Sequence, residues 1–170
     1  EAPAYTCNCQ SGYDLRTKDD GTKFCGNTDE CKGMDCGPGV CKDLIGDYTC
    51  ECPSGHYIGE KDGKKTCVPV RCADEAPELE NGKQTSDHNK EIDFPMTLEY
   101  RCKKGYSTDG TLAESKKNFN VQCKPDGMLV GMASCQKINC GTAPVLPFTK
   151  LKKPKSPQDQ IKFGDKAEYE

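Results

Sequence analysis

The chain has 170 residues and a formal net charge of −3 at pH 7, and 34% of its residues are hydrophobic. This content builds only a thin core, and 17 glycines and 11 prolines favour short strands and turns over long helices. No apolar run reaches the length of a membrane-spanning helix. Fourteen cysteines offset the thin core, because small extracellular domains that bury little apolar surface are commonly held together by disulfides.

Zinc binding is the alternative explanation for so many cysteines. Zinc fingers and ribbons pair knuckles such as Cys-x2-Cys with a second ligand pair, which commonly contains histidines. This chain has no Cys-x2-Cys pair, has Cys-x-Cys twice, at 7–9 and 50–52, and has only two histidines, His56 and His88. The pattern therefore favours disulfides and an oxidising, extracellular location.

The first residues, EAPAYTC, lack the charged and apolar regions of a signal peptide. A disulfide-bonded protein has to be exported. We therefore expect the export signal to lie outside this sequence or to have been removed.

In chain order, the cysteines fall into blocks with different spacing. The run at 7–25 has the pattern C-x-C-x15-C, which repeats the second half of the block at 31–67, C-x4-C-x4-C-x8-C-x-C-x14-C. In the block at 72–135, successive cysteines are separated by 29, 20 and 11 residues. Cys140 begins a further block.

The connectors between these blocks are residues 26–30, 68–72 and 136–139. They are too short to act as flexible tethers, so neighbouring blocks are expected to touch. Alternating apolar and polar residues predict half-buried strands at 97–102 and 119–123, and residues 161–170 also resemble a strand. The predicted fold is small, disulfide-rich and mostly β, with tandem modules arranged in a rod.

The block at 31–67 has a Cys-x-Cys centre, Tyr48 two residues before its fourth cysteine, and the turn Pro53-Ser54-Gly55 after its fifth. With these features and the five spacings between its six cysteines, it closely resembles an epidermal growth factor (EGF) module. That family pairs cysteines first to third, second to fourth and fifth to sixth. The implied disulfides are Cys31–Cys41, Cys36–Cys50 and Cys52–Cys67.

The run at 7–25 resembles the second half of another EGF module, with Gly12-Tyr13 at the expected turn. The resemblance implies a Cys9–Cys25 disulfide. It leaves Cys7 to a partner outside the sequence.

The block at 72–135 contains a further set of motif residues, namely Pro77, Asn81-Gly82, Tyr100-x-Cys102, Gly105-Tyr106, Cys123 with Gly127, and Cys135. These resemble a sushi, or complement control protein, module. Its first-to-third and second-to-fourth pairing implies Cys72–Cys123 and Cys102–Cys135. Leu129 stands where the family usually has tryptophan, which implies a smaller cap on the core.

A second sushi module is expected to begin at Cys140, whose partner would lie outside the sequence. The resemblances divide the chain into four parts. These are the C-terminal half of an EGF-like module at 1–26, a calcium-binding EGF-like module at 27–69, a sushi module at 70–137, and the N-terminal part of a second sushi module at 138–170.

Oxygen-bearing side chains gather around the first and third cysteines of the complete EGF-like block, in Asn27-Thr28-Asp29-Glu30 before Cys31 and in Asp43 after Cys41. Calcium is a hard cation that takes about six to eight oxygen ligands. Calcium-binding EGF modules place ligands at these positions. The resemblance assigns side-chain oxygens to Asn27, Glu30 and Asp43, and main-chain carbonyls to Thr28, Leu44 and Asp47.

The alternative is a solvated linker with an ordinary turn residue at Asp43, because Asn and Asp are common in turns. The coincidence of these residues with six cysteines in register favours calcium. Asp43 also occupies the position at which the family carries β-hydroxylated aspartate. Tandem EGF modules pack an aromatic residue on the next hairpin, which implies contact between Tyr13 and the Ile45-Gly46 turn.

A lysine-rich run, TKLKKPK at 149–155, forms a candidate polyanion patch through Lys150, Lys152, Lys153 and Lys155. The alternative is a solvated surface. The sequence supports no catalytic Ser/His/Asp or Cys/His arrangement, because every cysteine is explained by a disulfide. The sequence therefore predicts a protein without catalytic activity.

We expect a calcium-stabilised stalk, secreted or on the cell surface, that spaces and presents other domains of its chain. Its partners would be extracellular proteins or surface carbohydrate, in cell adhesion or in surface or matrix assembly, and not nucleic acid. Further modules are expected on both sides of the sequence. The alternative function is the regulatory arm of a secreted complement- or clotting-type serine protease, since some of these proteases join EGF and sushi modules.

Overall fold

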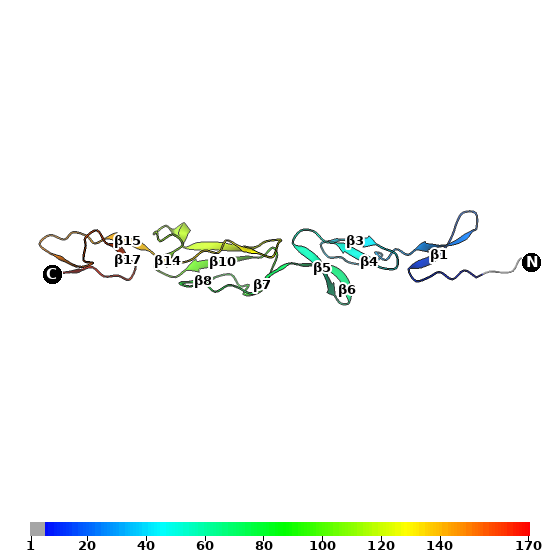
Figure 1. The fold of residues 1–170 in the computed structure, drawn as a ribbon, viewed down its shortest axis with the longest axis horizontal. Helices are drawn as coiled ribbons and strands as arrows, with labels where there is room; N and C mark the ends of the chain where they lie inside the picture. The colour runs from blue at the N-terminus through cyan, green and yellow to red at the C-terminus, as the bar shows by residue number, and fades with distance from the viewer. Residues whose placement is uncertain (1–5) are drawn as a thin grey trace, which may run out of the picture. The chain divides into compact units, whose positions relative to one another are not determined.

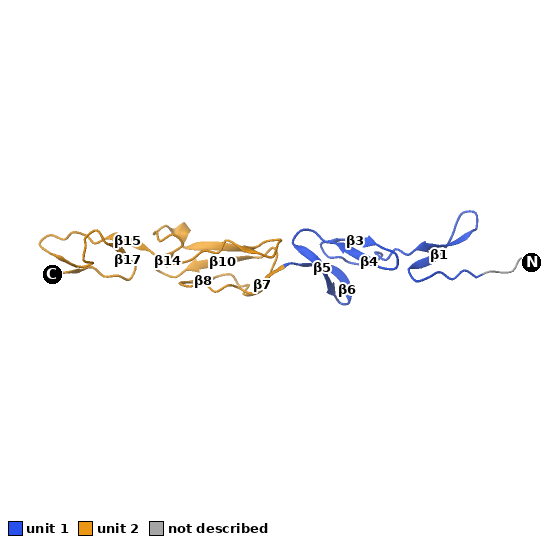
Figure 2. Ribbon diagram, viewed as in Figure 1, with its two compact units in different colours: residues 1–70 blue, residues 71–170 orange. Residues whose placement is uncertain are grey.

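The computed structural model describes residues 6–170 and is almost entirely β, with 44% of residues in strands and 2% in helix. It divides into two compact units, Glu1–Val70 and Arg71–Glu170 (Figures 1 and 2). Six disulfides and short strands confirm the predicted class of a small, disulfide-rich, mostly β protein. Within residues 6–170, the structure contains no helix with the length and hydrophobicity needed to cross a lipid bilayer.

The described part of unit 1, residues 6–70, contains three antiparallel hairpins. Their strands are β1 (Tyr13–Thr17) with β2 (Lys23–Asn27), β3 (Val40–Asp43) with β4 (Tyr48–Glu51), and β5 (His56–Lys61) with β6 (Lys64–Pro69). The buried cluster of this unit consists of Cys36, Cys50 and Cys67, with Tyr48 packed against it. Disulfide sulfur therefore replaces the aliphatic core that such a short chain cannot build.

Unit 2 contains a four-stranded sheet and several two-stranded pairs. The sheet has the order β13 (Leu129–Val130), β12 (Asn118–Cys123), β10 (Thr97–Cys102), β8 (Gly82–Gln84). The pairs are β7 (Arg71–Glu75) with β9 (Lys90–Asp93), β11 (Tyr106–Ser107) with β14 (Gln136–Lys137), β15 (Asn139–Thr142) with β17 (Gln160–Lys162), and β16 (Leu151–Lys153) with β18 (Glu168–Tyr169). A short 3-10 helix, η1, spans Glu114–Lys116.

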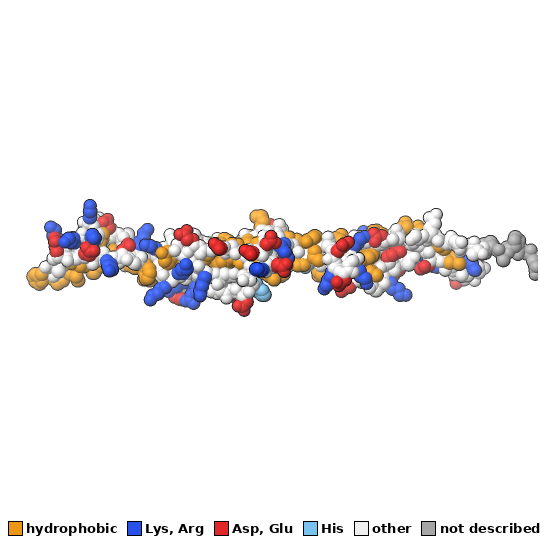
Figure 3. Space-filling view, turned by 90° about the horizontal axis from the view of Figure 1, so that it is seen from below, with side chains coloured by type: hydrophobic (Ala, Val, Ile, Leu, Met, Phe, Trp, Pro, Cys, Tyr) orange, Lys and Arg blue, Asp and Glu red, His pale blue; other side chains and the backbone are white. Residues whose placement is uncertain are grey.

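The core of unit 2 lies on one face of this sheet. Alternate residues of β10 are buried, so Leu98, Tyr100 and Cys102 point inward. Leu98 and Tyr100 join Ile92, Val121 and Cys123 in a buried cluster, against which several half-buried residues pack, Leu129 among them. The smaller residue at position 129 therefore still covers this core. Charged side chains of both signs are spread over the face of the molecule that Figure 3 shows.

The strand predictions have different outcomes. The strand expected at 97–102 is confirmed by β10, and the strand expected at 119–123 lies in β12, which begins one residue earlier. The single strand expected at 161–170 is wrong, because the chain turns after β17. In that turn Gly164 has a φ of +89°, and the N–H of Asp165 donates to the carbonyl of Lys162 at 2.9 Å. Residues 168–169 then form β18 as a separate strand.

The six disulfides are the six pairs that the family resemblances imply. They join Cys9–Cys25, Cys31–Cys41, Cys36–Cys50, Cys52–Cys67, Cys72–Cys123 and Cys102–Cys135. Within residues 6–170, Cys7 and Cys140 form no disulfide.

Candidate functional site

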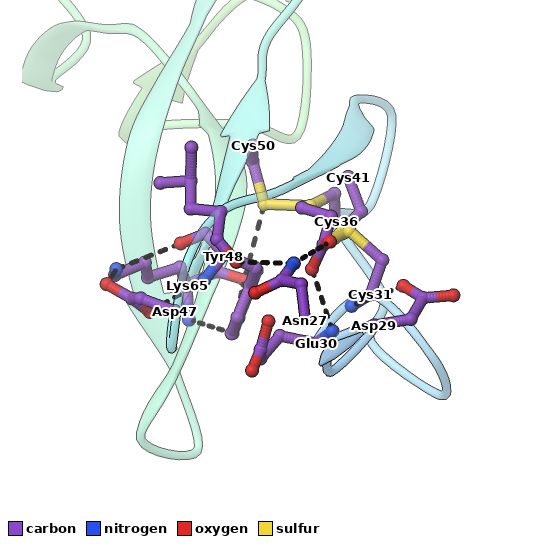
Figure 4. Close-up of a disulfide and its surroundings, with 12 residues drawn as sticks. Asn27, Asp29, Glu30, Cys31, Cys36, Cys41, Asp47, Tyr48, Cys50 and Lys65 are labelled. Atoms are coloured by element: carbon purple, nitrogen blue, oxygen red, sulfur yellow. Dashed lines mark hydrogen bonds and ion pairs between the residues drawn. A yellow bond between two sulfur atoms is a disulfide. The ribbon is translucent and has the colours of Figure 1, made fainter. Parts of the chain in front are cut away.

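Three oxygen-bearing residues of unit 1 come together at the start of the six-cysteine block. Asn27 ends β2, Glu30 lies in the following turn, and Asp43 ends β3. The disulfide between Cys31 and Cys41 holds the turn against the end of β3, beside Asn27 and Glu30 (Figure 4). Residues separated by up to 16 positions in sequence thus share one small site.

Asp43 is the centre of this site. One of its carboxylate oxygens accepts a hydrogen bond from Asn27 Nδ2 at 2.7 Å, and the other accepts one from the main-chain N–H of Glu30 at 2.9 Å. Asn27 Nδ2 also donates to the main-chain carbonyl of Leu44 at 3.3 Å. Since the N–H of Leu44 donates to the carbonyl of Asp47, five of the six predicted ligand residues are joined by hydrogen bonds.

Two oxygens of the site are buried and lack a partner. Asn27 Oδ1 and Glu30 Oε2 have no hydrogen-bond partner within residues 6–170. A buried acceptor without a partner costs about 1–3 kcal/mol, and more when it is charged. A bound cation would satisfy both oxygens, so the residues present fit a metal ion.

The amide of Asn27 supports the same conclusion. Its nitrogen lies against Asp43 Oδ2 and the carbonyl of Leu44, which are both acceptors. The two ends of an amide have nearly the same shape. A 180° flip of the amide would place Oδ1 of Asn27 where Nδ2 now lies. Asn27 Oδ1, Asp43 Oδ2 and the carbonyl oxygen of Leu44 would then face one position. Such a position is suited to a hard cation.

Charge in the site points in the same direction. The pKa of Glu30 is raised above its usual value, first by desolvation of its carboxylate and then by the adjacent carboxylate of Asp43. Two carboxylates crowded together disfavour each other's ionised form. A divalent cation between them would reverse this effect.

The carboxylate of Asp47 faces a different partner. Lys65 Nζ forms an ion pair with Asp47 Oδ2, donates to the carbonyl of Tyr48 at 3.0 Å, and lies 5.5 Å from the centre of the Tyr48 ring. The ion pair lowers the pKa of Asp47. The carbonyl of Asp47 accepts a hydrogen bond from the N–H of Leu44 at 2.9 Å. Because the carboxylate of Asp47 is paired with Lys65, only this carbonyl oxygen of Asp47 is available as a metal ligand.

No cluster of three or more His, Cys, Asp and Glu side chains suited to a metal occurs among residues 6–170. The site described above contains only two carboxylates. A cation there would therefore depend on amide and main-chain oxygens as well, which is typical of calcium.

The first two blocks are in contact, as their short connector predicts, and the contact is made by the main chain. A methyl group added at Gly12 would lie 2.5 Å from Gly46 Cα, so the two main chains are in direct contact. The N–H of Thr28 also donates to the carbonyl of Gly12 at 2.9 Å. Tyr13 is half-buried, whereas the Ile45 side chain remains 71% exposed. Packing of Tyr13 on Ile45 stays a prediction.

Arg16 takes part in this junction, although it belongs to none of the sequence motifs. Its Nη2 donates to the carbonyl of Asn27 at 2.5 Å, and its side chain covers the buried Gly26, at which an added methyl would lie 2.7 Å from Arg16 Cδ. Arg16 is therefore a positioning residue for the Asn27 segment. The cysteine pattern does not predict this role of Arg16, because the contact depends on the register of the β1–β2 hairpin.

The predicted lysine patch lies around β16. Lys152 and Lys153 form ion pairs with Glu170 and Glu168, at 3.9 and 3.4 Å. These contacts neutralise part of the charge on which the polyanion prediction depends.

Gly12→Ala is expected to loosen the junction beside the candidate metal site. The added methyl overlaps the main chain of Gly46, which should cost about 1–3 kcal/mol beyond the strain of a left-handed backbone. Gly21→Ala is a matched control, because Gly21 has almost the same φ, +83° against +84°, and no atom within 4 Å of the added methyl. Amide hydrogen exchange at Thr28 measures the contact, and equal exchange in both variants would contradict it.

No family model matches the chain. L-selectin of Bos taurus is 29% identical over an alignment of 146 positions, which covers 78% of this chain and 36% of that protein. Nidogen-2 of Mus musculus is 39% identical over 69 residues, which are 39% of this chain and 4% of that protein. The chain thus spans about a third or less of each relative.

Both relatives are extracellular, adhesion-type proteins. Together with the six disulfides, this likeness supports the assignment of the chain as a disulfide-rich extracellular module.

Proposed function

We propose that the chain is a calcium-stabilised, non-catalytic stalk of an extracellular adhesion or matrix protein. In this proposal, residues 1–26 and 27–69 are EGF-like modules, the second of which binds calcium. Residues 70–137 and 138–170 are a sushi module and the beginning of another. The stalk spaces and presents other domains and contacts protein or carbohydrate partners.

The observation that carries the proposal is the pair of buried oxygens without partners, Asn27 Oδ1 and Glu30 Oε2, beside the carboxylate of Asp43. Main-chain oxygens of Thr28, Leu44 and Asp47 would complete the shell. The set contains two formal negative charges and four neutral oxygens, which suits a divalent hard ion.

The site lies at a junction, and this location suggests what the ion does. Thr28 is next to Asn27 in the chain and is hydrogen-bonded to Gly12 of the preceding block, and Gly12 contacts Gly46 at the tip of the β3–β4 hairpin. A cation that ties Asn27 to Glu30 and Asp43 would hold the linker and the hairpin in one arrangement. Calcium would then fix the angle between the two EGF-like modules and set the reach of the stalk.

Calcium titration of the oxidised chain by calorimetry tests the proposal. We expect binding with a Kd of roughly 10⁻⁴–10⁻³ M, as in other extracellular calcium modules. Magnesium should bind more weakly, because it requires near-ideal octahedral geometry and gives up water reluctantly. Calcium should also slow proteolysis within residues 26–30. A correctly oxidised chain that takes up no calcium at roughly 10 mM would contradict the proposal.

A further inference from the structure

A pocket of about 730 Å³ lies in unit 2, and it is lined by positively charged side chains over an apolar floor. The volume is in the range of small-molecule binding sites. The cations are Lys83, Arg101, Lys103, Lys104 and Lys117, and the apolar residues of the floor are Leu112, Ile138 and Phe163. We propose that this pocket binds a sulfated polysaccharide. No residue of the calcium site takes part in it.

The register of the sheet brings two of these cations together. Arg101 of β10 pairs directly with Lys83 of β8, and both side chains are exposed. Like charges directly opposite each other destabilise a sheet. Glu114 offsets part of the charge of Arg101, whereas Lys83 has no ion pair with a described residue, so an anion in the pocket would further stabilise this pair.

The pocket also has few counter-ions of its own. No acidic side chain is among its described lining residues. Glu114 of η1 forms ion pairs with Arg101, at 3.5 Å, and with Lys117, at 2.5 Å. Lys83, Lys103 and Lys104 form no ion pair with another described residue. Three cations are therefore available to a ligand.

The floor of the pocket is held by main-chain contacts. The ring of Phe163 lies over Gly105, at which an added methyl would lie only 1.9 Å from Phe163 Cδ1. The N–H of Ile138 donates to the carbonyl of Gly105, and the N–H of Phe163 donates to the carbonyl of Ile138, both at 2.9 Å. Main-chain hydrogen bonds therefore fix the positions of Ile138 and Phe163, so the apolar floor of the pocket is preformed.

The combination of cations and an apolar floor favours a sulfated polysaccharide over other anions. Its sulfates supply several negative charges, and the C–H face of a sugar ring can pack on Phe163 and Leu112. An acidic peptide offers the charge without such rings. Lysine and arginine side chains also gather on the face of unit 2 near β8 and β14 in Figure 3, so an extended anion could run across the pocket.

Heparin oligosaccharide is the probe, titrated into the intact chain at roughly physiological salt. The triple variant Lys83→Gln, Lys103→Gln, Lys104→Gln is expected to bind about tenfold more weakly, which corresponds to about 1.4 kcal/mol. The matched control is Lys18→Gln, Lys23→Gln, Lys61→Gln, which removes the same charge from exposed lysines of unit 1 outside the pocket. This control should change the affinity by less than about twofold.

Several outcomes would overturn the proposal. These are no binding by the unmodified chain, equal losses in the two triple variants, or equal binding of desulfated heparin. Polyglutamate that competes as well as heparin would assign the pocket to acidic peptides instead. The heparin titrations are repeated with a calcium chelator. Heparin binding should be unchanged, because the pocket contains no residue of the candidate calcium site. The test of the pocket is therefore independent of whether unit 1 binds calcium. Disulfide mapping confirms that both variants are correctly folded.

Discussion

Asp43→Asn is expected to weaken calcium binding by about 10- to 100-fold, the range seen when supporting groups of a metal site are removed. Asp43 accepts from both Asn27 and Glu30, so it organises the site as well as supplying charge. Asparagine keeps the size of the side chain but removes one of two negative charges. Calorimetric titration with calcium measures the change.

Asp47→Asn is the matched control for this variant. It makes the same chemical change on the same hairpin, but the carboxylate of Asp47 is paired with Lys65 and only its carbonyl is a predicted ligand. Its calcium affinity should stay within about threefold of the unmodified chain. Equal losses in the two variants would mean that general negative charge attracts calcium, and that no built site exists.

Tyr100→Ala is expected to destabilise unit 2 by about 3–5 kcal/mol, as for other large aromatic residues in cores. Tyr100 is 1% exposed, and its ring is stacked on Phe119 with 5.4 Å between centroids. Its hydroxyl donates to the carbonyl of Pro77 at 2.8 Å. Amide hydrogen exchange in β10 and β12 reports on unit 2 by itself, which is useful because the two units need not unfold together.

Tyr100→Phe separates packing from hydrogen bonding. It keeps the ring and removes the bond to Pro77, so a loss of about 0.5–1.5 kcal/mol is expected. If alanine cost no more than phenylalanine, the ring would not be the centre of this core.

The cysteine framework was the most predictable part of the fold. Family resemblance implied six pairs, and the structure contains these six, because fixed loop lengths between cysteines restrict which side chains can meet. Alternation also located β10. The strand expected at 161–170 was wrong because alternation cannot show that Gly164 adopts a left-handed turn and ends the pairing.

The candidate calcium site was predictable as a set of residues, but its surroundings were not. Asn27, Glu30 and Asp43 follow from their positions relative to cysteines. The contact of Gly12 with Gly46 and the cover that Arg16 gives to Gly26 depend on how hairpins meet, which no local pattern encodes. The cationic pocket was missed for a similar reason, since Lys83 and Arg101 are separated in sequence and meet only through the register of the sheet.

The placement of the disulfides determines which proteolytic cuts release a fragment of the chain. Each of the six bonds closes a loop inside residues 9–25, 31–67 or 72–135. If only these six disulfides are considered, cleavage of a peptide bond inside a loop leaves the two pieces joined by a disulfide. A cut in one of the short connectors releases a fragment. A single cut within residues 26–30, the segment that carries Asn27 and Glu30, would therefore separate the 9–25 loop from the disulfide loops that follow it.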